Sequence, residues 1–499
     1  MPPIRVHVKW SGRKFEDIEL NTDEPASLFK MQLFSLTGVA PERQKIMIKG
    51  GMLKDDTDMS KLNVKDGHTF MMMGTAGELL KEPVDKPVFM EDMSESQVNQ
   101  ALNIPVGLQN LGNTCYMNAT LQCLRAMPEL QANLKEYQGA ISGMDHRGAL
   151  TASLRDLFNQ MGEYGEGFPP LVFLQMLRQA FPQFAQMGQG GVPMQQDAEE
   201  CWSQIVSILK AKLPAHDEKN FIERYMTGQL VSALKCDEAP DEEPVVNTED
   251  FLKLNCHISI NTNMMQQGIM ESLDEKIEKN SPSLNRQAVY TKSSRVSRLP
   301  KYLTVQFMRF FWKPEQRVKA KILRKVKFPH ELDATEFCTE ELKKKLVPVR
   351  DRLREVENER LAAERAKSKA KRDQEVQGQS GGDSMAIDSA GEKKEASGEQ
   401  AGETSASTDW STVVDPELAA DAGCNVSGQY ELSAVLTHVG RSADSGHYIG
   451  WVRKEGTKEW WKFDDDKVSQ VKPEDILKLE GGGDWHTAYI LLYSEKKLE

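Results

Sequence analysis

A cysteine, a histidine and an aspartate that are far apart in the sequence have the residue types of a thiol hydrolase. Cys115 lies in the stretch 107–123, GLQNLGNTCYMNATLQC, where a glycine-containing loop leads into an apolar pattern with helical spacing at Met117, Leu121 and Leu124. The pattern places Cys115 in the first helical turn. Unpaired backbone N–H groups and the helix dipole lower the pKa of a thiol there, and the thiolate is the nucleophile.

The loop before Cys115 contributes two asparagines. Asn113 is a residue type that caps helices, and we expect it to start this one. Asn110, five residues before Cys115, can place an amide N–H₂ beside the sulfur, where a donor would stabilise the oxyanion of an acyl-transfer intermediate. A free cysteine is more often a small buried hydrophobe. A catalytic interpretation therefore requires a base and a carboxylate that orients it.

Both are found near the C-terminus, in SADSGHYIGWVRKEGTKEWWKFDDDKVS. Aromatic and β-branched residues on both sides of Glu455 and Gly456 predict a hairpin, and a turn centred between these two residues places His447 opposite Asp464. Such a carboxylate fixes the imidazole tautomer and leaves the other ring nitrogen to activate Cys115. A shift of one residue in the turn pairs His447 with Asp465 instead. The sequence therefore leaves both carboxylates open.

His438, in AVLTHVG, is an alternative base. A lone histidine at the end of a strand is more often structural. His447 follows a glycine, begins a predicted strand and lies across from a carboxylate, so it is the favoured base. The remaining cysteines lack such a partner and are predicted to be inert: Cys123, Cys201, Cys236, Cys256, Cys338 and Cys424.

Composition limits the class of protein. A chain of 499 residues is expected to form two or more domains, and a net charge of −12 argues against nucleic acid as the main partner. No apolar run has the length of a membrane span, and the N-terminus does not resemble a signal peptide. Seven scattered cysteines do not make a disulfide framework, which favours a reducing cytoplasmic or nuclear compartment. No CxxC pair occurs, so we expect no structural zinc and no other metal or cofactor.

The first 76 residues have the element order of a β-grasp domain, with predicted strands at 4–10, 15–20, 45–49 and 68–73 and a helix at 25–37. The phrases IMIKGGMLKDD and KLNVKDGHTFMMM resemble ubiquitin, with Met47, Met71 and Met73 at its exposed recognition face. Strand alternation places Met72 on the opposite face, so part of this methionine cluster is expected in the core. The resemblance ends in Gly-Thr-Ala instead of Arg-Gly-Gly, which implies a built-in ubiquitin-like module that cannot be conjugated and that a partner recognises.

Residues 77–103 are polar and acidic and predict a flexible linker. Residues 104–499 predict a second domain of the α+β class. Helical periodicity comes first, at 121–127, 148–160, 171–181 and 196–212. Strand-like segments follow, at 228–235, 251–259, 302–310 and 429–438. This order predicts a helical part and a sheet part with a cleft between them. An insertion at about 350–420 begins with a charged helix over 350–372 that has little to bury. It continues with a polar stretch over 373–408 that we expect to be disordered.

Four segments resemble the Cys box and the His box of the ubiquitin-specific proteases: GLQNLGNTCYMNATLQCL, QQDAEECW, SGHYIGWV and WWKFDDDKVS. The resemblance implies a papain-like hydrolase with thumb, palm and fingers subdomains. It also implies Cys115 as nucleophile, His447 as base, Asp464 as orienting carboxylate and Asn110 as oxyanion donor. Further residues are expected near the incoming ubiquitin tail: Gln196, Asp197, Glu200 and Tyr448. The Cys₄ zinc site common in the family is absent from the sequence.

Three parts of the chain are similar to members of the family that associate with the proteasome: the N-terminal module, SSRVSRLPKYLTVQFMRFFWK and GGGDWHTAYILLY. That similarity implies an isopeptidase acting on proteasome-bound ubiquitin conjugates, docked through residues 1–76 and monomeric when free. It also implies loops at 311–326 and 440–445 that cover the cleft in the free enzyme. A non-catalytic ubiquitin receptor or proteasome regulator is the alternative, and this role can coexist with catalysis.

Overall fold

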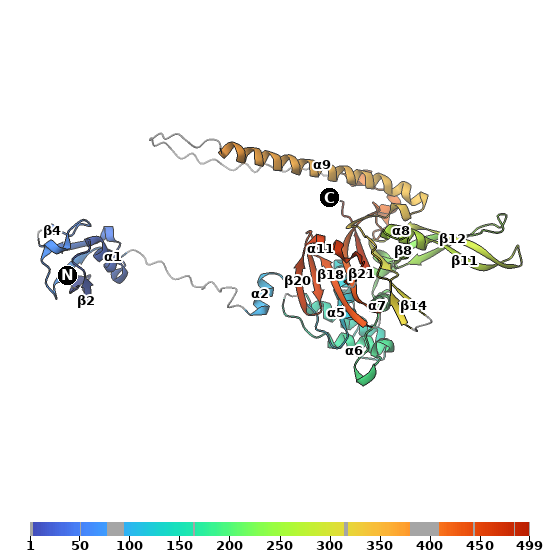
Figure 1. The fold of residues 1–499 in the computed structure, drawn as a ribbon, viewed down its shortest axis with the longest axis horizontal. Helices are drawn as coiled ribbons and strands as arrows, with labels where there is room; N and C mark the ends of the chain where they lie inside the picture. Colours follow the sequence, from blue (N-terminus) through green and yellow to red (C-terminus); the bar gives the residue numbers. More distant parts are fainter. Residues whose placement is uncertain are drawn as a thin grey trace. The chain divides into compact units, whose positions relative to one another are not determined.

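The computed structural model describes residues 3–49, 51–76, 94–162, 165–313, 318–379, 409–442, 445–483 and 485–498. The chain divides into two compact units, Met1–Asp92 and Met93–Glu499 (Figure 1).

The N-terminal unit has the β-grasp fold that its sequence predicts. Its elements are β1 (Ile4–Trp10), β2 (Arg13–Leu20), α1 (Ala26–Thr37), β3 (Lys45–Ile48), β4 (Gly51–Met52) and β5 (Thr69–Met73). The strand order is β2-β1-β5-β3-β4, and the first and last strands run parallel at its centre. Phe29 and Leu33 of α1 pack with Val6, Val8 and Phe70 of the sheet to form the core. The predicted strands and helix are confirmed, and the two-residue strand β4 is too short to show a pattern.

The methionines of this unit divide as strand alternation predicts. Met72 is 3% exposed and lies in the core, whereas the exposed fractions of Met47, Met71 and Met73 are 45%, 54% and 55%. Met47 is opposite Met71 in the β3–β5 pairing and opposite Met52 in the β3–β4 pairing. We call Met47, Met52, Met71 and Met73 the methionine face.

The predicted linker contains a helix, α2 (Glu95–Ala101). The Ser94 N–H donates to Gln97 Oε1 at 2.9 Å, and the Gln97 N–H donates to Ser94 Oγ at 3.3 Å. This reciprocal pair is a capping box, which can start a helix in a polar segment. The prediction of a linker over 77–103 is therefore wrong at 95–101, while residues 77–93 lie outside the described residues.

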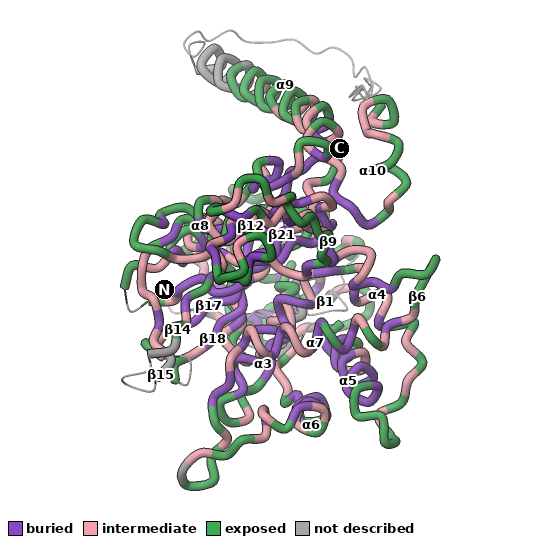
Figure 2. Tube along the Cα trace, turned by 90° about the vertical axis from the view of Figure 1, so that its right-hand side faces the viewer, coloured by how far each residue is buried: buried purple, intermediate pink, exposed green. Residues whose placement is uncertain are grey.

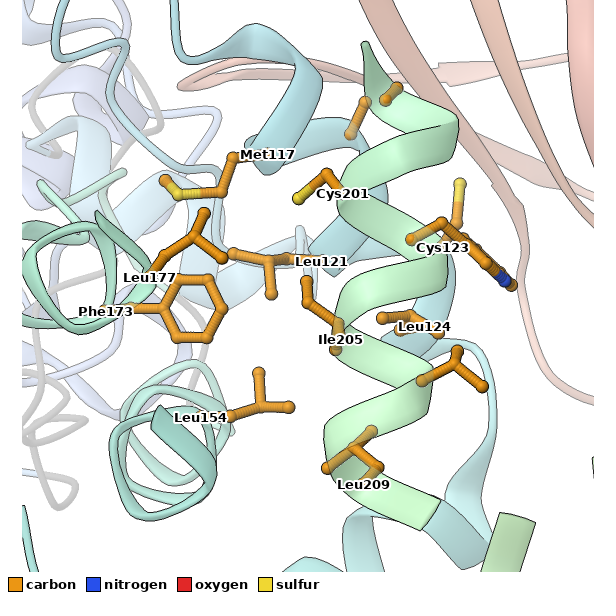
Figure 3. Close-up of a cluster of buried hydrophobic side chains, with 14 of the residues drawn as sticks. Met117, Leu121, Cys123, Leu124, Leu154, Phe173, Leu177, Cys201, Ile205 and Leu209 are labelled. Atoms are coloured by element: carbon orange, nitrogen blue, oxygen red, sulfur yellow. The ribbon is translucent and has the colours of Figure 1, made fainter. Parts of the chain in front are cut away.

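The second unit begins with a helical part built around α3 (Cys115–Arg125). The neighbouring helices are α4 (Pro128–Glu136), α5 (His146–Gln160), α6 (Leu171–Ala180) and α7 (Ala198–Lys212). Figure 3 shows Leu121 of α3 facing Ile205 of α7, with Leu154 of α5 and Phe173 of α6 completing the cluster. Every residue of α3 from Cys115 to Leu124 is buried. The helix that begins at the cysteine is thus held on all sides.

The later part of the chain forms a large sheet. Its main path is β10 (Leu254–Cys256), β13 (Tyr302–Phe307), β21 (Thr487–Glu495), β17 (Gln429–Ser442), β18 (Ser445–Arg453), β19 (Trp460–Asp464) and β20 (Lys467–Val471). Helix α3 packs against β18. A Cβ atom on Gly450 would lie 3.2 Å from the Ala119 carbonyl oxygen. The absence of a side chain at Gly450 therefore lets the helix that carries Cys115 lie close to the strand that carries His447.

A separate antiparallel sheet of order β11-β12-β8-β9 projects from this body (Figure 1). Its strands are β8 (Gly228–Cys236), β9 (Val245–Phe251), β11 (Asp274–Ser281) and β12 (Arg286–Arg298), and α8 (Met265–Leu273) precedes β11. The helical part, the large sheet and this projecting sheet correspond to thumb, palm and fingers. The predicted α+β class, with a β-grasp unit before it, is confirmed.

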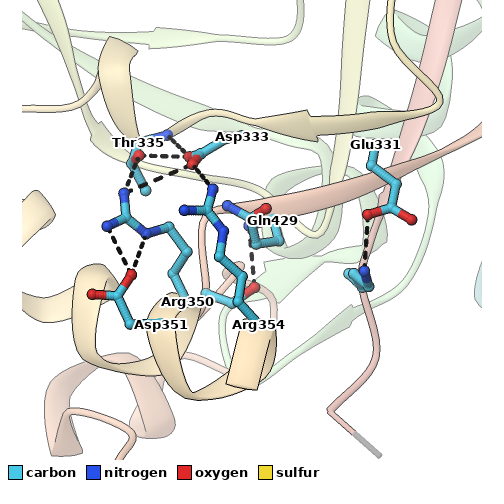
Figure 4. A network of polar contacts seen from close by, with 9 residues as sticks. Glu331, Asp333, Thr335, Arg350, Asp351, Arg354 and Gln429 are labelled. Atoms are coloured by element: carbon cyan, nitrogen blue, oxygen red, sulfur yellow. Dashed lines mark hydrogen bonds and ion pairs between the residues drawn. The ribbon is translucent and has the colours of Figure 1, made fainter. Parts of the chain in front are cut away.

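Helix α9 (Glu340–Gln379) is longer than the predicted charged helix and begins inside the body. Leu342, Leu346, Val349 and Leu353 are buried along one face. Arg354 donates to Asp333 Oδ2 at 2.7 Å, and Arg350 contacts Thr335 Oγ1 at 3.3 Å (Figure 4). The prediction that the 350–420 insertion lies outside the packed body is therefore wrong for its first part, because apolar residues alternate there with charges. The predicted disorder is wrong at 373–379, which belong to α9, and residues 380–408 lie outside the described residues.

The segment 311–326, predicted as a loop, contributes to a hairpin of β14 (Phe310–Lys313) and β15 (Val318–Lys321). Ala320 of β15 pairs with Ser442 at the end of β17. Segment 440–445 spans the end of β17 and the start of β18. The described residues 311–313, 318–321, 440–442 and 445 of the two predicted loops therefore belong to strands of one sheet.

Burial is most complete in α3, β13 and β21, whereas the outer part of α9 is exposed (Figure 2). Among the described residues, no helix has both the length and the apolar content needed to cross a membrane.

Candidate functional site

Cys115 is the first residue of α3, which confirms its predicted place in the first helical turn. The predicted cap is wrong. Thr114 occupies the N-cap position, and Asn113 adopts a left-handed φ of 53° and donates from Nδ2 to the Pro193 carbonyl oxygen at 2.9 Å. The asparagine side chain therefore holds the segment before α7 against the cysteine loop.

The Cys115 side chain is 2% exposed and lies among N–H groups from two elements. The Tyr448 backbone N–H of β18 donates to Cys115 Sγ at 3.5 Å. Nε2 of Gln195, just before α7, donates to the same sulfur at 3.6 Å. A thiolate formed there has hydrogen-bond donors already in place.

His447 lies beside this sulfur and is oriented by Asp464. His447 Nε2 and Asp464 Oδ1 are 2.7 Å apart, which leaves Nδ1 for Cys115. The hydrogen bond to Asp464, followed by the hydrogen bond to Cys115, raises the pKa of His447 from 6.5 to about 10. The imidazole is therefore protonated at neutral pH beside the sulfur, an arrangement that favours a thiolate–imidazolium pair.

The hairpin reaches this geometry in a different register from the one predicted. Gly450 pairs with Phe463, so the residue opposite Asp464 is Ile449 and not His447. The turn is centred one residue later than predicted, with the Lys454 N–H donating to the Glu459 carbonyl oxygen at 2.9 Å. The predicted direct pairing is therefore wrong by two residues. Since residues two apart share a face of the sheet, His447 and Asp464 still meet as diagonal neighbours.

The second oxygen of Asp464 has its own partner. Lys462 Nζ lies 2.9 Å from Asp464 Oδ2 and 5.8 Å from the centre of the Trp451 ring. The hydrogen bond to His447, with a further contribution from Lys462, holds the pKa of the Asp464 carboxyl well below its usual range despite burial. Asp464 is therefore a carboxylate throughout the physiological range.

Asp465, the alternative carboxylate, holds the cysteine loop instead. Its Oδ2 accepts from Asn110 Nδ2 and its Oδ1 accepts from Asn118 Nδ2, each at 2.9 Å. Its carbonyl oxygen accepts from the Leu108 N–H at 3.0 Å. Gly107 allows this close approach, because a Cβ atom there would lie 2.5 Å from the Asp466 carbonyl oxygen. The two neighbouring aspartates thus act on different halves of the site.

Asn110 is positioned by bonds at both ends of its amide. Its Oδ1 accepts from the backbone N–H groups of Gly112 at 3.0 Å and Thr114 at 3.2 Å, while its Nδ2 donates to Asp465. One N–H of the amide is thus used by the carboxylate, and a role at an oxyanion would fall to the other.

His438, the alternative base, lies beneath the site. Its side chain is 0% exposed, and Nε2 lies 3.1 Å from the Ser445 carbonyl oxygen. Burial, with a smaller effect of Lys321, lowers the pKa of His438 to about 3. A histidine that stays neutral and internally bonded fits the structural role.

The family resemblance implies that four residues contact the ubiquitin tail. These residues lie close to Cys115 in the fold, but their side chains differ in how exposed they are. Asp197 caps α7 by accepting from the Glu199 N–H at 2.8 Å, and it accepts from the Tyr489 hydroxyl at 2.9 Å. Gln196 is 9% exposed, and its Nε2 has no partner among the described residues. Glu200 is half-buried and accepts from Gln183 at 3.4 Å. The Tyr448 side chain is 1% exposed.

The other cysteines are buried and unpaired. Burial raises the pKa of Cys123, Cys256, Cys338 and Cys424 to about 12, and it also raises that of Cys201. These five thiols stay protonated at neutral pH. In the part of the chain that is described, no group of three His, Cys, Asp or Glu residues is placed to hold a metal ion.

Gln195, Asn118 and Lys462 contact the site but are not singled out by the sequence. Lys462 could have been found from strand parity, because it lies two residues before Asp464 on the same face. Gln195 is the first residue of the recognised phrase QQDAEECW, next to Gln196, which is the glutamine that the resemblance assigns to the ubiquitin tail. Nothing in local spacing shows which of the two turns toward Cys115.

Comparisons with known proteins identify two families in the chain. The family model "Ubiquitin carboxyl-terminal hydrolase" matches residues 106–493, and the model "Ubiquitin family" matches residues 4–77. The chain is 45% identical over 501 residues to ubiquitin carboxyl-terminal hydrolase 7 of Arabidopsis thaliana, with 99% of both chains covered. It is 46% identical over 498 residues to ubiquitin carboxyl-terminal hydrolase 6 of Schizosaccharomyces pombe, again with 99% of both covered. It is 36% identical to ubiquitin carboxyl-terminal hydrolase 14 of Caenorhabditis elegans, covering 99% of this chain and 94% of the relative.

Proposed function

Because the chain belongs to the ubiquitin carboxyl-terminal hydrolase family and is a cysteine-type deubiquitinase, we propose that Cys115, His447 and Asp464 are its catalytic residues. The observation that carries this assignment is the His447–Asp464 hydrogen bond of 2.7 Å beside the sulfur of Cys115. A ubiquitin receptor without catalysis has no need of an oriented base next to a helix-terminal thiol.

In the proposed reaction the Cys115 thiolate attacks the carbonyl carbon of the last glycine of ubiquitin, and the C=O π electrons move to the oxygen. Asn110 donates its second amide N–H to this oxyanion. The intermediate collapses, the C–N bond breaks, and the His447 imidazolium protonates the departing lysine amine. Water then attacks the thioester and gives a proton to His447. The C–S bond breaks and ubiquitin leaves with a free carboxylate.

The direct test is reaction of the full-length protein with a ubiquitin that carries a C-terminal thiol-reactive group. A covalent adduct on Cys115, located by peptide mass, supports the assignment, and an adduct on another cysteine contradicts it.

We propose that the ubiquitin tail contacts four residues near the cysteine. Glu200 is half-exposed, which supports a contact with the basic tail of ubiquitin. Gln196, Asp197 and the backbone of Tyr448 would line the same path.

We propose that the ubiquitin-like unit docks the enzyme to the proteasome through the methionine face. Four methionines about half exposed on neighbouring strands make an apolar patch that a monomeric soluble domain has no structural reason to expose. The enzyme would then act on proteasome-bound conjugates and can also regulate the proteasome without catalysis. Free, unpaired cysteines support a cytoplasmic and nuclear location, and we expect a monomer when the protein is not docked.

Met71→Glu is expected to weaken proteasome association about tenfold, because it places a charge in the middle of an apolar contact. Association is measured by co-sedimentation of the purified proteins. Hydrolysis of a fluorogenic ubiquitin substrate by the free enzyme should stay unchanged, since the substitution lies in the other unit. The matched control is Leu28→Glu, at a residue of α1 that is 48% exposed. Equal loss in both variants, or no loss with Met71→Glu, contradicts docking through the methionine face.

We also propose that the free enzyme is closed and that docking opens it. The β14–β15 hairpin pairs with the end of β17, and the next strand, β18, carries His447. Cys115 is 2% exposed in this arrangement. Opening of the hairpin and of the β17–β18 connection would admit the ubiquitin tail, and a partner that binds the open form would shift the population toward it.

Proteasomes are expected to raise the hydrolysis rate of a fluorogenic ubiquitin substrate strongly. If the open form is about 1% populated, removal of that cost raises apparent affinity for ubiquitin about a hundredfold. The measurement uses proteasomes whose own ubiquitin hydrolase has been blocked, and Cys115→Ala supplies the background rate. A rate that proteasomes leave unchanged would mean that these segments do not gate the cleft.

A further inference from the structure

Gln195 brings an amide to the reaction centre from a segment outside the cysteine loop. Its Nε2 donates to Cys115 Sγ at 3.6 Å, and its side chain is 8% exposed. The Tyr448 N–H donates to the same sulfur at 3.5 Å. The sulfur therefore receives N–H groups from the segment before α7 and from β18.

The segment that carries Gln195 is anchored on both sides of it. Two residues before, the Pro193 carbonyl oxygen accepts from Asn113 Nδ2 at 2.9 Å, which ties the segment to the cysteine loop. Two residues after, Asp197 caps α7 and accepts from the Tyr489 hydroxyl at 2.9 Å. These anchors fix the backbone around Gln195, so its amide is directed at the sulfur before substrate binds.

The amide of Asn110 occupies a different position. Its Nδ2 donates to Asp465 and its Oδ1 accepts from two backbone N–H groups of the cysteine loop. In this structure the side-chain amide that donates to Cys115 Sγ belongs to Gln195. Gln195 therefore contacts the sulfur, whereas the role proposed above for Asn110 is at the carbonyl oxygen of the substrate.

We propose that Gln195 is a further catalytic residue, which stabilises the thiolate of Cys115 by donating a hydrogen bond to its sulfur. This inference rests on the proposed role of Cys115 as nucleophile. A hydrogen bond to the charged form of an acid favours that form, and the buried position of Gln195 excludes water that would compete for the sulfur. The proton stays on the amide nitrogen, and His447 carries out the proton transfers.

The test is Gln195→Met, which keeps the length of the side chain and removes the donor. The alkylation rate of Cys115 by iodoacetamide is measured against pH, from the mass of the Cys115 peptide. Hydrogen bonds to charged groups shift a pKa by about one to two units, and 3.6 Å is a long contact, so we expect the midpoint to rise by about one pH unit. The kcat/KM for a fluorogenic ubiquitin substrate should fall about tenfold. Gln195→Glu, of equal length but without a donor at neutral pH, should raise the midpoint further.

Gln186→Met is the matched control, because Gln186 is exposed and lies in the same segment; its midpoint should equal that of the unmodified protein. Ubiquitin affinity and the melting temperature are measured for each variant. If Gln195→Met is poorly folded, Gln195→Glu decides the question. An unchanged midpoint in a folded Gln195 variant overturns the proposal, whatever its hydrolysis rate. Hydrolysis that survives Cys115→Ala would instead overturn the assignment of the nucleophile.

Discussion

Cys115→Ala is expected to abolish ubiquitin release while leaving ubiquitin binding largely intact. The substitution removes the nucleophile and a side chain that is only 2% exposed, so the surface that meets ubiquitin is little changed. Loss of the nucleophile lowers kcat by about 10⁶-fold in a serine protease, which also works through an acyl-enzyme, and we expect a loss of that order here. Hydrolysis is measured with purified protein and a fluorogenic ubiquitin substrate, and binding is measured by calorimetry. Turnover by the alanine variant that is within about a hundredfold of the original protein would contradict the assignment.

His447→Ala should be nearly as severe, because the thiol loses both its proton acceptor and the acid that protonates the leaving amine. His216→Ala serves as the control, since His216 is an exposed histidine bonded to Glu136 at 2.8 Å. Comparable losses in the two variants would show that the effect is not specific to the base.

Asp464→Asn is expected to lower kcat/KM and to move its alkaline limb toward neutral pH. The hydrogen bond to Asp464 is the largest cause of the raised pKa of His447, which is about 10 in the folded protein. Without it the imidazolium loses its proton at a lower pH, so the thiolate–imidazolium pair breaks down sooner as pH rises. The same raised pKa contributes stability that is complete below about pH 6.5 and is lost as pH rises through about 10. The measurement is kcat/KM between pH 5 and 11 with a fluorogenic ubiquitin substrate, together with thermal melts.

Asp465→Asn is the matched control for this prediction. It should also reduce activity, because an asparagine cannot accept from Asn110 and Asn118 with both side-chain atoms as Asp465 does. The alkaline limb should move much less than in Asp464→Asn, since Asp465 raises the pKa of His447 only through a small charge effect and not through a hydrogen bond. A shifted limb in Asp465→Asn, with none in Asp464→Asn, would exchange the roles of the two carboxylates.

The pair of His447 and Asp464 could be predicted from sequence in spite of a wrong register. Turn centre and register depend on a few weak interactions around Gly456, which local patterns do not resolve. The error was an even number of residues, and side chains two apart point to the same face of a strand. The face of the sheet on which a side chain lies is therefore easier to predict than the residue opposite it on the next strand. A correct face is sufficient to bring the imidazole of His447 to the carboxylate of Asp464.

Other parts of the site follow from contacts between segments that local patterns do not encode. Asn113 has the composition of a cap, yet its side chain bonds to Pro193, eighty residues later. The sequence leaves Asp465 open as a partner of His447, whereas in the structure it binds Asn110 of the cysteine loop and Asn118 of α3. The sequence predicts a start of helix α9 near residue 350, because the dense charge of its first turns masks the buried Leu342 and Leu346. In each case contacts between distant segments determine the partner of a side chain or the start of a helix, and the local sequence does not.

The place of β21 in the large sheet has a consequence for biosynthesis. This strand follows both β13 and β17 in the sequence, yet it lies between them in the sheet and pairs with both. During translation the ribosome has therefore released β13 and β17 before the strand that joins them exists, and their free edges must wait unpaired. A nascent chain that ends before Thr487 contains Cys115, His447 and Asp464 but lacks the centre of the sheet that aligns them. Assembly of the candidate site therefore waits for a strand that is made after all three of its residues.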